Sequence, residues 1–205
     1  MSMVTNWGYE LTNQSVLPNM MSAEEYITMT GRNDDGSRVE MESAAACAAI
    51  RNYVGWHLFP AAGCKLKTTI DDRRVTFVGN DALIQLPARH VTNVSSVVIG
   101  GVTYTGFFCE TNGLLRVYDV EQRYNHAAVE VQYTAGLNEN MMAPIKELIA
   151  HRITHAIAVP PGITSEASGG VSVTYNAGWI NNSRATALAG DNKELLIPYR
   201  VTGVF

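Results

Sequence analysis

Hydrophobic residues between positions 144 and 159 recur at three- and four-residue spacing, which places them on one face of a helix. Pro144 suits a first helical turn, and the run Pro160-Pro161-Gly162 cannot continue the helix. The stretch therefore predicts a helix with one buried face, made by Ile145, Leu148, Ile149, Ile153, Ala156 and Ile157.

Two capping boxes predict further helix starts, because a serine is followed three residues later by a glutamate at Ser22 and at Ser37. The first helix should end near Thr30, and the second near Trp56 or His57. Four alanines of the second helix (Ala44, Ala45, Ala48 and Ala49) leave room for another helix on its flank. Its inward stripe has the spacing of a bundle seam and consists of Val39, Ser43, Ala46, Ile50, Tyr53 and His57, with Cys47 and Val54 alongside.

The pattern changes from helical to alternating between Cys64 and Tyr133, where β-branched and aromatic residues are common. The pairs Gly100-Gly101 and Asn112-Gly113 favour tight two-residue hairpins. We expect an antiparallel meander with strands at residues 65–70, 74–78, 83–86, 94–99, 102–108, 114–118 and 128–134.

The two ends of the chain show weaker patterns. Residues 1–21 have no period and predict an arm that Trp7 and Tyr9 could anchor. Near the C-terminus, Val171, Val173 and Tyr175 predict a strand that needs a sheet to join, in its own chain or preferably in another subunit. The apolar residues 195–200 predict a tail that docks onto a folded body, either its own or a neighbour's.

These patterns together predict an α+β fold. Its parts are a small helical bundle (22–61 and 139–161), an inserted antiparallel β-domain (62–138), an N-terminal arm (1–21), and a C-terminal strand with a docking arm (162–205).

Composition narrows the classes of function. The formal net charge is −4, with no dominant basic face, which argues against a protein that grips DNA phosphates. Three separated cysteines favour reduced, packed thiols over a disulfide framework or a metal site. Neither a signal peptide nor a run long enough to span a membrane is recognisable, so we expect aqueous, intracellular surroundings.

The first 60 residues are acidic, with seven acids (Glu10, Glu24, Glu25, Asp34, Asp35, Glu40 and Glu42) against three bases (Arg32, Arg38 and Arg51).

Candidate catalytic chemistry is sparse. His151 and His155 have the spacing of a zinc-hydrolase helix, but Arg152 stands where that motif has its glutamate, so a metal site is not expected. Arg152 lies in the apolar arc, and it either forms an ion pair, within or between subunits, or extends its charge out of the core. Asp71 and Asp72 are adjacent and should point to opposite faces of a hairpin. Because nucleophile elbows and phosphate-binding loops are also absent from the sequence, we expect neither an enzyme nor a cofactor.

The order of these elements resembles the head–tail connector (adaptor) proteins of tailed bacteriophages. The resemblance covers most of residues 22–200 and rests on patterns: an Ala-rich helix that ends in Tyr53-Val54-Gly55, the β-rich runs 94–104 and 129–136, the helix from Pro144 with its Pro-Pro-Gly stop, the strand region 165–175, and the closing Leu195-Leu196-Ile197-Pro198-Tyr199-Arg200.

The resemblance implies a structural protein of the virion neck, assembled in the cytoplasm of the bacterial host. Such connectors form a ring, commonly dodecameric, beneath the portal protein. The ring extends the channel through which the double-stranded DNA passes without sequence-specific binding, and it joins the head to the next neck, stopper or tail protein. The expected portal or intersubunit contacts are Val171, Val173, Tyr175, Leu195, Leu196, Ile197, Tyr199 and Arg200, with Arg152 as a candidate interface ion pair.

A near-neutral to acidic channel wall would not grip DNA phosphates, so we expect some acids of the N-terminal region to face the lumen: Glu24, Glu25, Asp34, Asp35, Glu40 and Glu42. The alternatives are a virion decoration or host-binding module that uses the β-domain and, third, a zinc-dependent enzyme.

Overall fold

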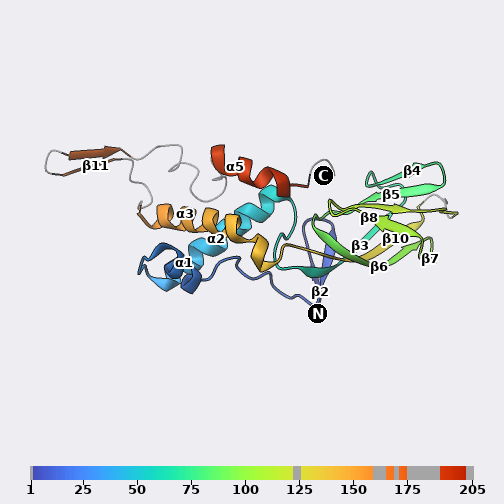
Figure 1. The fold of residues 1–205 in the computed structure, drawn as a ribbon, viewed down its shortest axis with the longest axis horizontal. Coiled ribbons are helices and arrows are strands. Elements are labelled where there is room, and N and C mark those ends of the chain that lie inside the picture. Colours follow the sequence, from blue (N-terminus) through green and yellow to red (C-terminus); the bar gives the residue numbers. More distant parts are fainter. Residues whose placement is uncertain (1, 122–125, 159–164, 169–170, 175–189, 202–205) are drawn as a thin grey trace. The chain divides into compact units, whose positions relative to one another are not determined.

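A computed structural model describes residues 2–121, 126–158, 165–168, 171–174 and 190–201. The chain forms two compact units, which are described separately (Figure 1). The β-unit comprises Met1–Pro18, Val54–Glu139 and Tyr199–Phe205, and the helical unit comprises Asn19–Tyr53 and Asn140–Pro198. Helices and antiparallel sheets are largely separate along the chain, so the predicted α+β class is confirmed.

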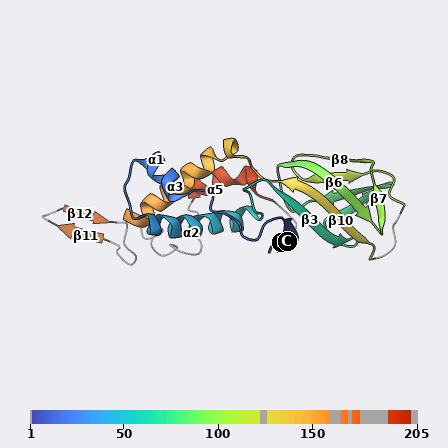
Figure 2. The same ribbon diagram turned by 90° about the horizontal axis from the view of Figure 1, so that it is seen from below.

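The helical unit is built on three helices, α1 (Ala23–Thr30), α2 (Gly36–Val54) and α3 (Ala143–Ala158). Figure 2 shows α2 on one side of this unit and α1 with α3 on the other. A further short helix, α5 (Gly190–Leu196), leads into the 3-10 turn η2 (Ile197–Tyr199), and another such turn, η1 (Glu139–Met141), precedes α3.

Helix α1 begins and ends as its sequence predicts. Ser22 and Glu25 form the expected capping box, in which the Glu25 N–H donates to the Ser22 hydroxyl and the Ser22 N–H donates to the Glu25 carboxylate. Gly31 closes the helix in the left-handed conformation (φ 67°) and donates to the carbonyl of Ile27.

The second capping box was predicted wrongly. Helix α2 begins at Gly36, and the Asp35 carboxylate accepts hydrogen bonds from both the N–H and the hydroxyl of Ser37. Asp35 outcompetes Ser37 as the cap because a carboxylate favours the positive end of the helix. Glu40 is thereby released from the box and binds Asn19 and the N–H of Ala23 instead.

The inward face of α2 follows the predicted stripe only as far as the helix extends. Val39, Ser43, Ala46 and Ile50 are buried, and Tyr53 is half-buried. Helix α2 ends at Val54, so His57 lies beyond it, buried in the β-unit.

Helix α3 also largely matches its prediction. It starts at Ala143, which puts Pro144 in the first turn, and it is described as far as Ala158. Its buried side chains include Ile145, Leu148, Ile149 and Ile153, whereas Ala156 and Ile157 are half-buried.

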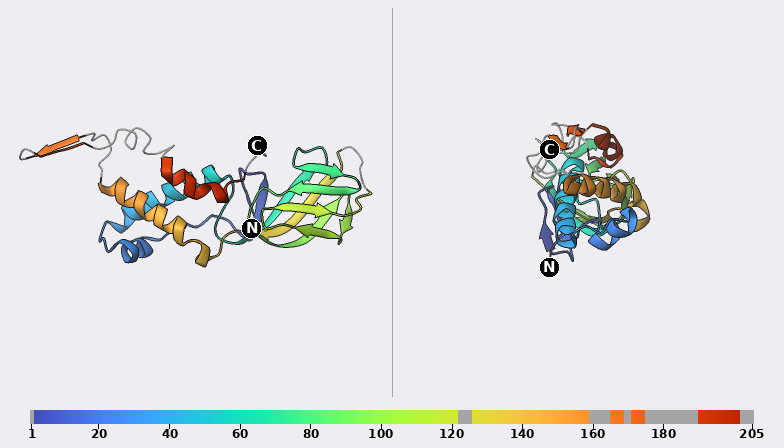
Figure 3. Two further views of the ribbon diagram at one scale, coloured as in Figure 1. Left: turned by 45° about the horizontal axis from the view of Figure 1, so that its top comes forward. Right: turned by 90° about the vertical axis from the view of Figure 1, so that its left-hand side faces the viewer.

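The β-unit holds two antiparallel sheets (Figure 3). The six-stranded sheet has the order β1 (Ser2–Val4), β2 (Tyr9–Thr12), β3 (Ala62–Thr69), β10 (Ala128–Ala135), β6 (Val91–Ile99) and β7 (Val102–Tyr104). The four-stranded sheet has the order β4 (Val75–Val78), β5 (Asp81–Gln85), β9 (Leu114–Val117) and β8 (Phe107–Cys109).

The meander prediction was therefore wrong in topology, although each predicted strand region contains a strand. β10 lies between β3 and β6, and the stretch 102–108 is divided between the two sheets as β7 and β8. Gly106 lies between these two strands, and its carbonyl accepts the N–H of Tyr118. Two inner faces can then close over one core, which includes Leu66, Val131, Ile84 and Leu115.

The two predicted hairpin turns have different outcomes. Gly100 and Gly101 form a two-residue turn between β6 and β7, both with positive φ, as predicted. At the second site Asn112 has no positive φ, Gly113 (φ 90°) donates to the Glu110 carbonyl, and Glu110 donates to Leu114. That geometry is a longer hairpin with a glycine bulge, not the two-residue turn we expected.

The predicted N-terminal arm is instead part of a sheet. β1 and β2 form a hairpin, and β2 pairs with β3 from Tyr9 opposite Leu66 to Thr12 opposite Gly63. Tyr9 is 3% exposed, so it anchors the segment as a core residue of the β-unit. Alternation over four residues was too short a signal to predict this strand.

Candidate assembly surfaces

A hydrogen-bonded cluster joins α1 to α3 in the helical unit. The buried Tyr26 donates its hydroxyl to Asp34 (2.9 Å), and that hydroxyl also lies 3.0 Å from the hydroxyl of Thr154. Arg32 binds the same Asp34 carboxylate at 2.7 Å, and this hydrogen bond is the main reason why the pKa of Asp34 is lowered. The cluster holds α1 and α3 in place relative to each other, so the surface between the two helices has a defined shape.

That surface contains a groove of about 410 Å³, the α1–α3 groove, lined by Glu24, Glu25, Thr28, Met29 and Lys146. Lys146 and Glu25 form an ion pair across it at 2.6 Å, and Met29 is 49% exposed. Burial would raise the pKa of Glu25, but hydrogen bonds from Lys146 and from the Ser22 N–H outweigh it and lower the pKa. The groove thus combines an exposed apolar side chain with one ion pair and the carboxylate of Glu24.

The structure gives five of the six candidate lumen acids a role inside the helical unit. Asp34 and Glu25 are paired as just described, Asp35 caps α2, and Glu40 holds Asn19 and the Ala23 N–H. Glu42 acts on Arg152 through its charge. Glu24 lies exposed on the rim of the α1–α3 groove. Their orientation toward a lumen stays a prediction. Sequence reasoning missed the roles of Glu25 toward Lys146 and of Glu42 toward Arg152 because these partners lie far along the chain.

Arg152 is half-buried on α3. Burial lowers the pKa of its guanidinium, and the negative charge of Glu42 opposes this shift. An electrostatic partner within the same unit is therefore present.

His151 is exposed and His155 half-buried on the same helix. Among the residues that the structure describes, no group of three or more potential ligands could hold a metal ion.

The C-terminal segment binds its own chain. The indole N–H of Trp56 donates to the Tyr199 carbonyl at 2.6 Å, and the N–H of Val201 donates to the Val54 carbonyl at 2.9 Å. The Tyr199 ring lies 6.1 Å from that of His90. The docking that the sequence predicted for this tail thus takes place on the β-unit of the same chain.

The predicted contact residues in the tail differ in accessibility. Leu196 is fully buried, whereas Leu195 (54%) and Ile197 (57%) are exposed and Arg200 is exposed as well. Leu195, Ile197 and Arg200 are consequently the members of that set that a partner could reach while the tail stays docked.

Two short strands, β11 (Ser165–Ser168) and β12 (Val171–Thr174), form a separate antiparallel sheet. Val171 and Val173 belong to β12, while Tyr175 lies outside the described residues. Within the described part of the chain, neither strand pairs with a strand of another sheet. A two-stranded sheet is marginally stable alone in water, so this hairpin needs a supporting surface.

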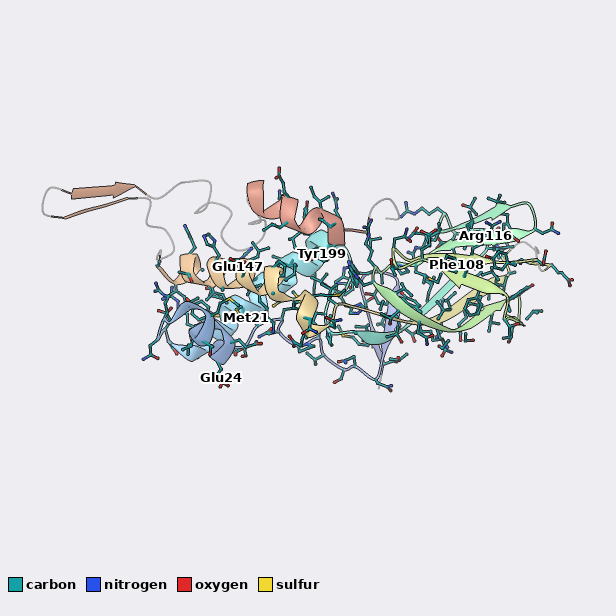
Figure 4. The ribbon with its side chains drawn as sticks, viewed as in Figure 1. Met21, Glu24, Phe108, Arg116, Glu147 and Tyr199 are labelled. Carbon is teal, nitrogen blue, oxygen red and sulfur yellow. The ribbon has the colours of Figure 1, made fainter. Side chains whose placement is uncertain are left out.

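The outward faces of the two sheets in the β-unit differ in character. The six-stranded sheet presents a charged ladder, with Lys67 paired to Glu10 and Lys65 to Glu130. The four-stranded sheet presents Val78 (54% exposed), Phe108 (58%) and Tyr118 (41%) around Arg116, as Figure 4 shows for Phe108 and Arg116. Phe108 is in register with Arg116, which is paired with Asp81 at 2.6 Å. An aromatic surface with a neutralised arginine is typical of a protein-binding face.

The cysteines are packed as the sequence predicted. Cys47 and Cys64 are buried, Cys109 is half-buried, and none is in a disulfide. Burial raises the pKa of Cys64 to about 12 and that of Cys109 to about 11, so both thiols are protonated at neutral pH.

Comparison with known proteins assigns no family to this chain. No protein-family model matches the chain, and a search of curated proteins finds no match. Among the described residues, no helix has the combined length and hydrophobicity that crossing a membrane requires.

Proposed function

We propose that this protein is a structural subunit of a phage neck, a head–tail connector that forms a ring under the portal protein. The observation that carries the proposal is the β11–β12 hairpin (Ser165–Ser168 and Val171–Thr174), which forms a sheet of its own. A hairpin that needs external support fits a subunit completed by its neighbours or by the portal. The resemblance in the order of elements supports the same assignment, including the β-domain inserted between α2 and α3.

In this role the ring lets genomic DNA pass through its lumen and offers a platform to the next neck or tail protein. The exposed Leu195 and Ile197 beside the docked tail supply further apolar contact area for the portal. The protein acts through assembly, without catalysis, cofactor or metal.

The test is binding to purified portal protein of the same phage, measured by sedimentation and by electron microscopy of the complex. The full chain should bind as a ring, and replacement of residues 165–174 by a Gly-Ser linker should weaken binding at least tenfold. Truncation at Gly190 should weaken it as well, while Ala128→Lys, at an exposed alanine of the β-unit, should not. A chain that binds no portal and is absent from the neck in images of the particle would exclude this function.

A second function, a virion decoration or host-binding module, is favoured by the outward face of the four-stranded sheet. Its exposed Phe108 and Tyr118 are unusual for a solvated sheet face. The double variant Phe108→Ser/Tyr118→Ser distinguishes the two functions. It should leave portal binding unchanged in a connector, and it should abolish attachment to capsids or host cells in a decoration or host-binding protein.

A further inference from the structure

The outward side of α2 has the wrong chemistry for a helix surrounded by water. Six exposed residues share this side, the α2 outer face, and none is charged: Ser37, Met41, Ala44, Ala45, Ala48 and Asn52. Met41 is 58% exposed. A solvated helix normally carries charged residues opposite its buried face. The uncharged face extends over about 22 Å at the rise of an α-helix.

The α1–α3 groove has complementary properties. It is a hollow of about 410 Å³ with Met29 exposed in it, and its Glu25 and Lys146 form an ion pair with each other. An uncharged helix face can enter such a groove without separating this ion pair, while Glu24 on the rim stays at the solvent edge. The alanines allow close approach of the helix axis, because helix separation depends on the side chains at the contact.

One copy of the protein cannot make this contact with itself. The buried side of α2 faces the segment before α1, because the Ser43 hydroxyl donates to the Met21 carbonyl and the Met20 N–H donates to Cys47. The α2 outer face points the opposite way, and α1 and α3 lie on the other side of the helical unit (Figure 2). The groove and the face that fits it are therefore on different sides of one unit.

We infer that the α1–α3 groove of one copy receives the α2 outer face of a second copy. The contact joins two different surfaces, so a bound pair still has one free groove and one free face, on different copies, and the series of contacts is closed only when the copies form a ring. This contact rests on the proposed function, because a ring requires copies that assemble side by side. It is the subunit contact of the ring.

Two lysine substitutions separate the two halves of this contact. Met29→Lys blocks the groove. The substitution is compatible with helix α1, because the new lysine follows Glu25 by four residues, a favourable spacing for opposite charges. Ala48→Lys blocks the α2 outer face at an exposed position, where lysine is a good helix former. Ala128→Lys, an exposed alanine of the β-unit, is the matched control. Circular dichroism and the melting temperature show whether each variant is folded.

Native mass spectrometry and sedimentation velocity on the full chain give the readout. Each variant alone should lose self-association at least tenfold, while Ala128→Lys should associate like the unaltered chain. A mixture of the two blocked variants retains one intact groove and one intact face, so it should form a heterodimer and nothing larger.

Variants that still assemble like the unaltered chain, or a mixture without a heterodimer, overturn the inference. If Met29→Lys leaves self-association intact and loses only portal binding, the groove receives the portal and the inference is likewise overturned. Both results leave the proposed function standing, because it is judged by portal binding and by the presence of the protein in the neck.

Discussion

The hydroxyl group of Tyr9 lies 2.7 Å from Nδ1 of His57, and the backbone N–H of His57 donates to the same hydroxyl oxygen at 3.0 Å. Since the oxygen accepts from the backbone, its own proton is available for Nδ1, and Nε2 then carries the hydrogen that it donates to the Ala135 carbonyl (3.0 Å). All three residues are buried. The network ties the N-terminal hairpin, the chain leaving α2 and the end of β10 into one unit.

Replacement of Tyr9 by phenylalanine should destabilise the β-unit by about 1–3 kcal/mol, because it leaves buried polar groups of His57 without partners. Urea unfolding followed by fluorescence measures the change. Tyr118→Phe, at a 41% exposed position, is the control and should change the stability by less than about 0.5 kcal/mol. Equal effects of the two substitutions would show that the network contributes nothing beyond the loss of a hydroxyl group.

Replacement of Trp56 by phenylalanine should loosen the C-terminal segment. An aromatic ring is kept, although it is smaller than the buried indole, and the donor to the Tyr199 carbonyl is lost. One hydrogen bond of about 1 kcal/mol corresponds to roughly a fivefold change in the fraction of released tails. Limited trypsin digestion at Lys193 and Arg200 should be faster by about that factor. Trp7→Phe, in the turn between β1 and β2, should not change it.

The parts of the fold that the sequence predicted are those that local chemistry decides. The capping box at Ser22, the stop at Gly31 and the Gly100-Gly101 turn each depend on a few adjacent residues, and all three are present. The order of strands in the sheets depends on which hydrophobic faces meet, and β10 reaches β3 across more than fifty intervening residues. Periodicity places a residue on a face but does not say which strand lies beside it.

The candidate assembly surfaces show the same contrast between features encoded by adjacent residues and features that depend on residues far apart in the sequence. The sequence indicated an apolar tail and an unsupported strand, yet the docking of Tyr199 on Trp56 joins residues 143 positions apart. The α1–α3 groove likewise depends on the pairing of Glu25 with Lys146, which no local motif encodes. Only the alanines of α2 gave a signal for a helix-packing flank before the structure was known.

The cap of α2 can be tested directly against the original expectation. Asp35→Ala should destabilise the helical unit by about 1 kcal/mol, because it removes the acceptor for the Ser37 N–H and hydroxyl. Ser37→Ala should cost less, since the backbone N–H of residue 37 can still bind Asp35. Urea unfolding of both variants compares them, and a larger loss for Ser37→Ala would restore Ser37 as the cap.

The stability of the helical unit should depend on pH through Glu25. The pKa of Glu25 is lowered on folding from its ordinary value of 4.5, so its ion pair contributes stability above that value and loses it as the pH falls through the folded-state pKa. The contribution stays below about 1 kcal/mol because the Glu25 side chain is 44% exposed. Lys146→Met should therefore be less stable than the unaltered chain at about pH 7 and should approach it at about pH 3. Lys193→Met, at an exposed lysine of α5, should show no such convergence in the same urea titrations.

Gly136 should tolerate no side chain, for two separable reasons. Its φ is 133°, which L residues rarely adopt, and a Cβ atom there would lie 2.5 Å from Cα of Ala61 and 2.6 Å from the carbonyl oxygen of Pro60. Gly101 shares the first constraint, with φ at 82°, but no atom lies within 4 Å of its would-be Cβ. Gly101→Ala should thus cost only the strain of a left-handed conformation, about 1–2 kcal/mol. Gly136→Ala adds a backbone clash at the exit of β10 and should cost at least about 3 kcal/mol. Urea unfolding of both variants measures the difference between their losses of stability, which isolates the contribution of the backbone clash. Similar losses of stability for the two variants would mean that the backbone around Ala61 can move away at no energetic cost.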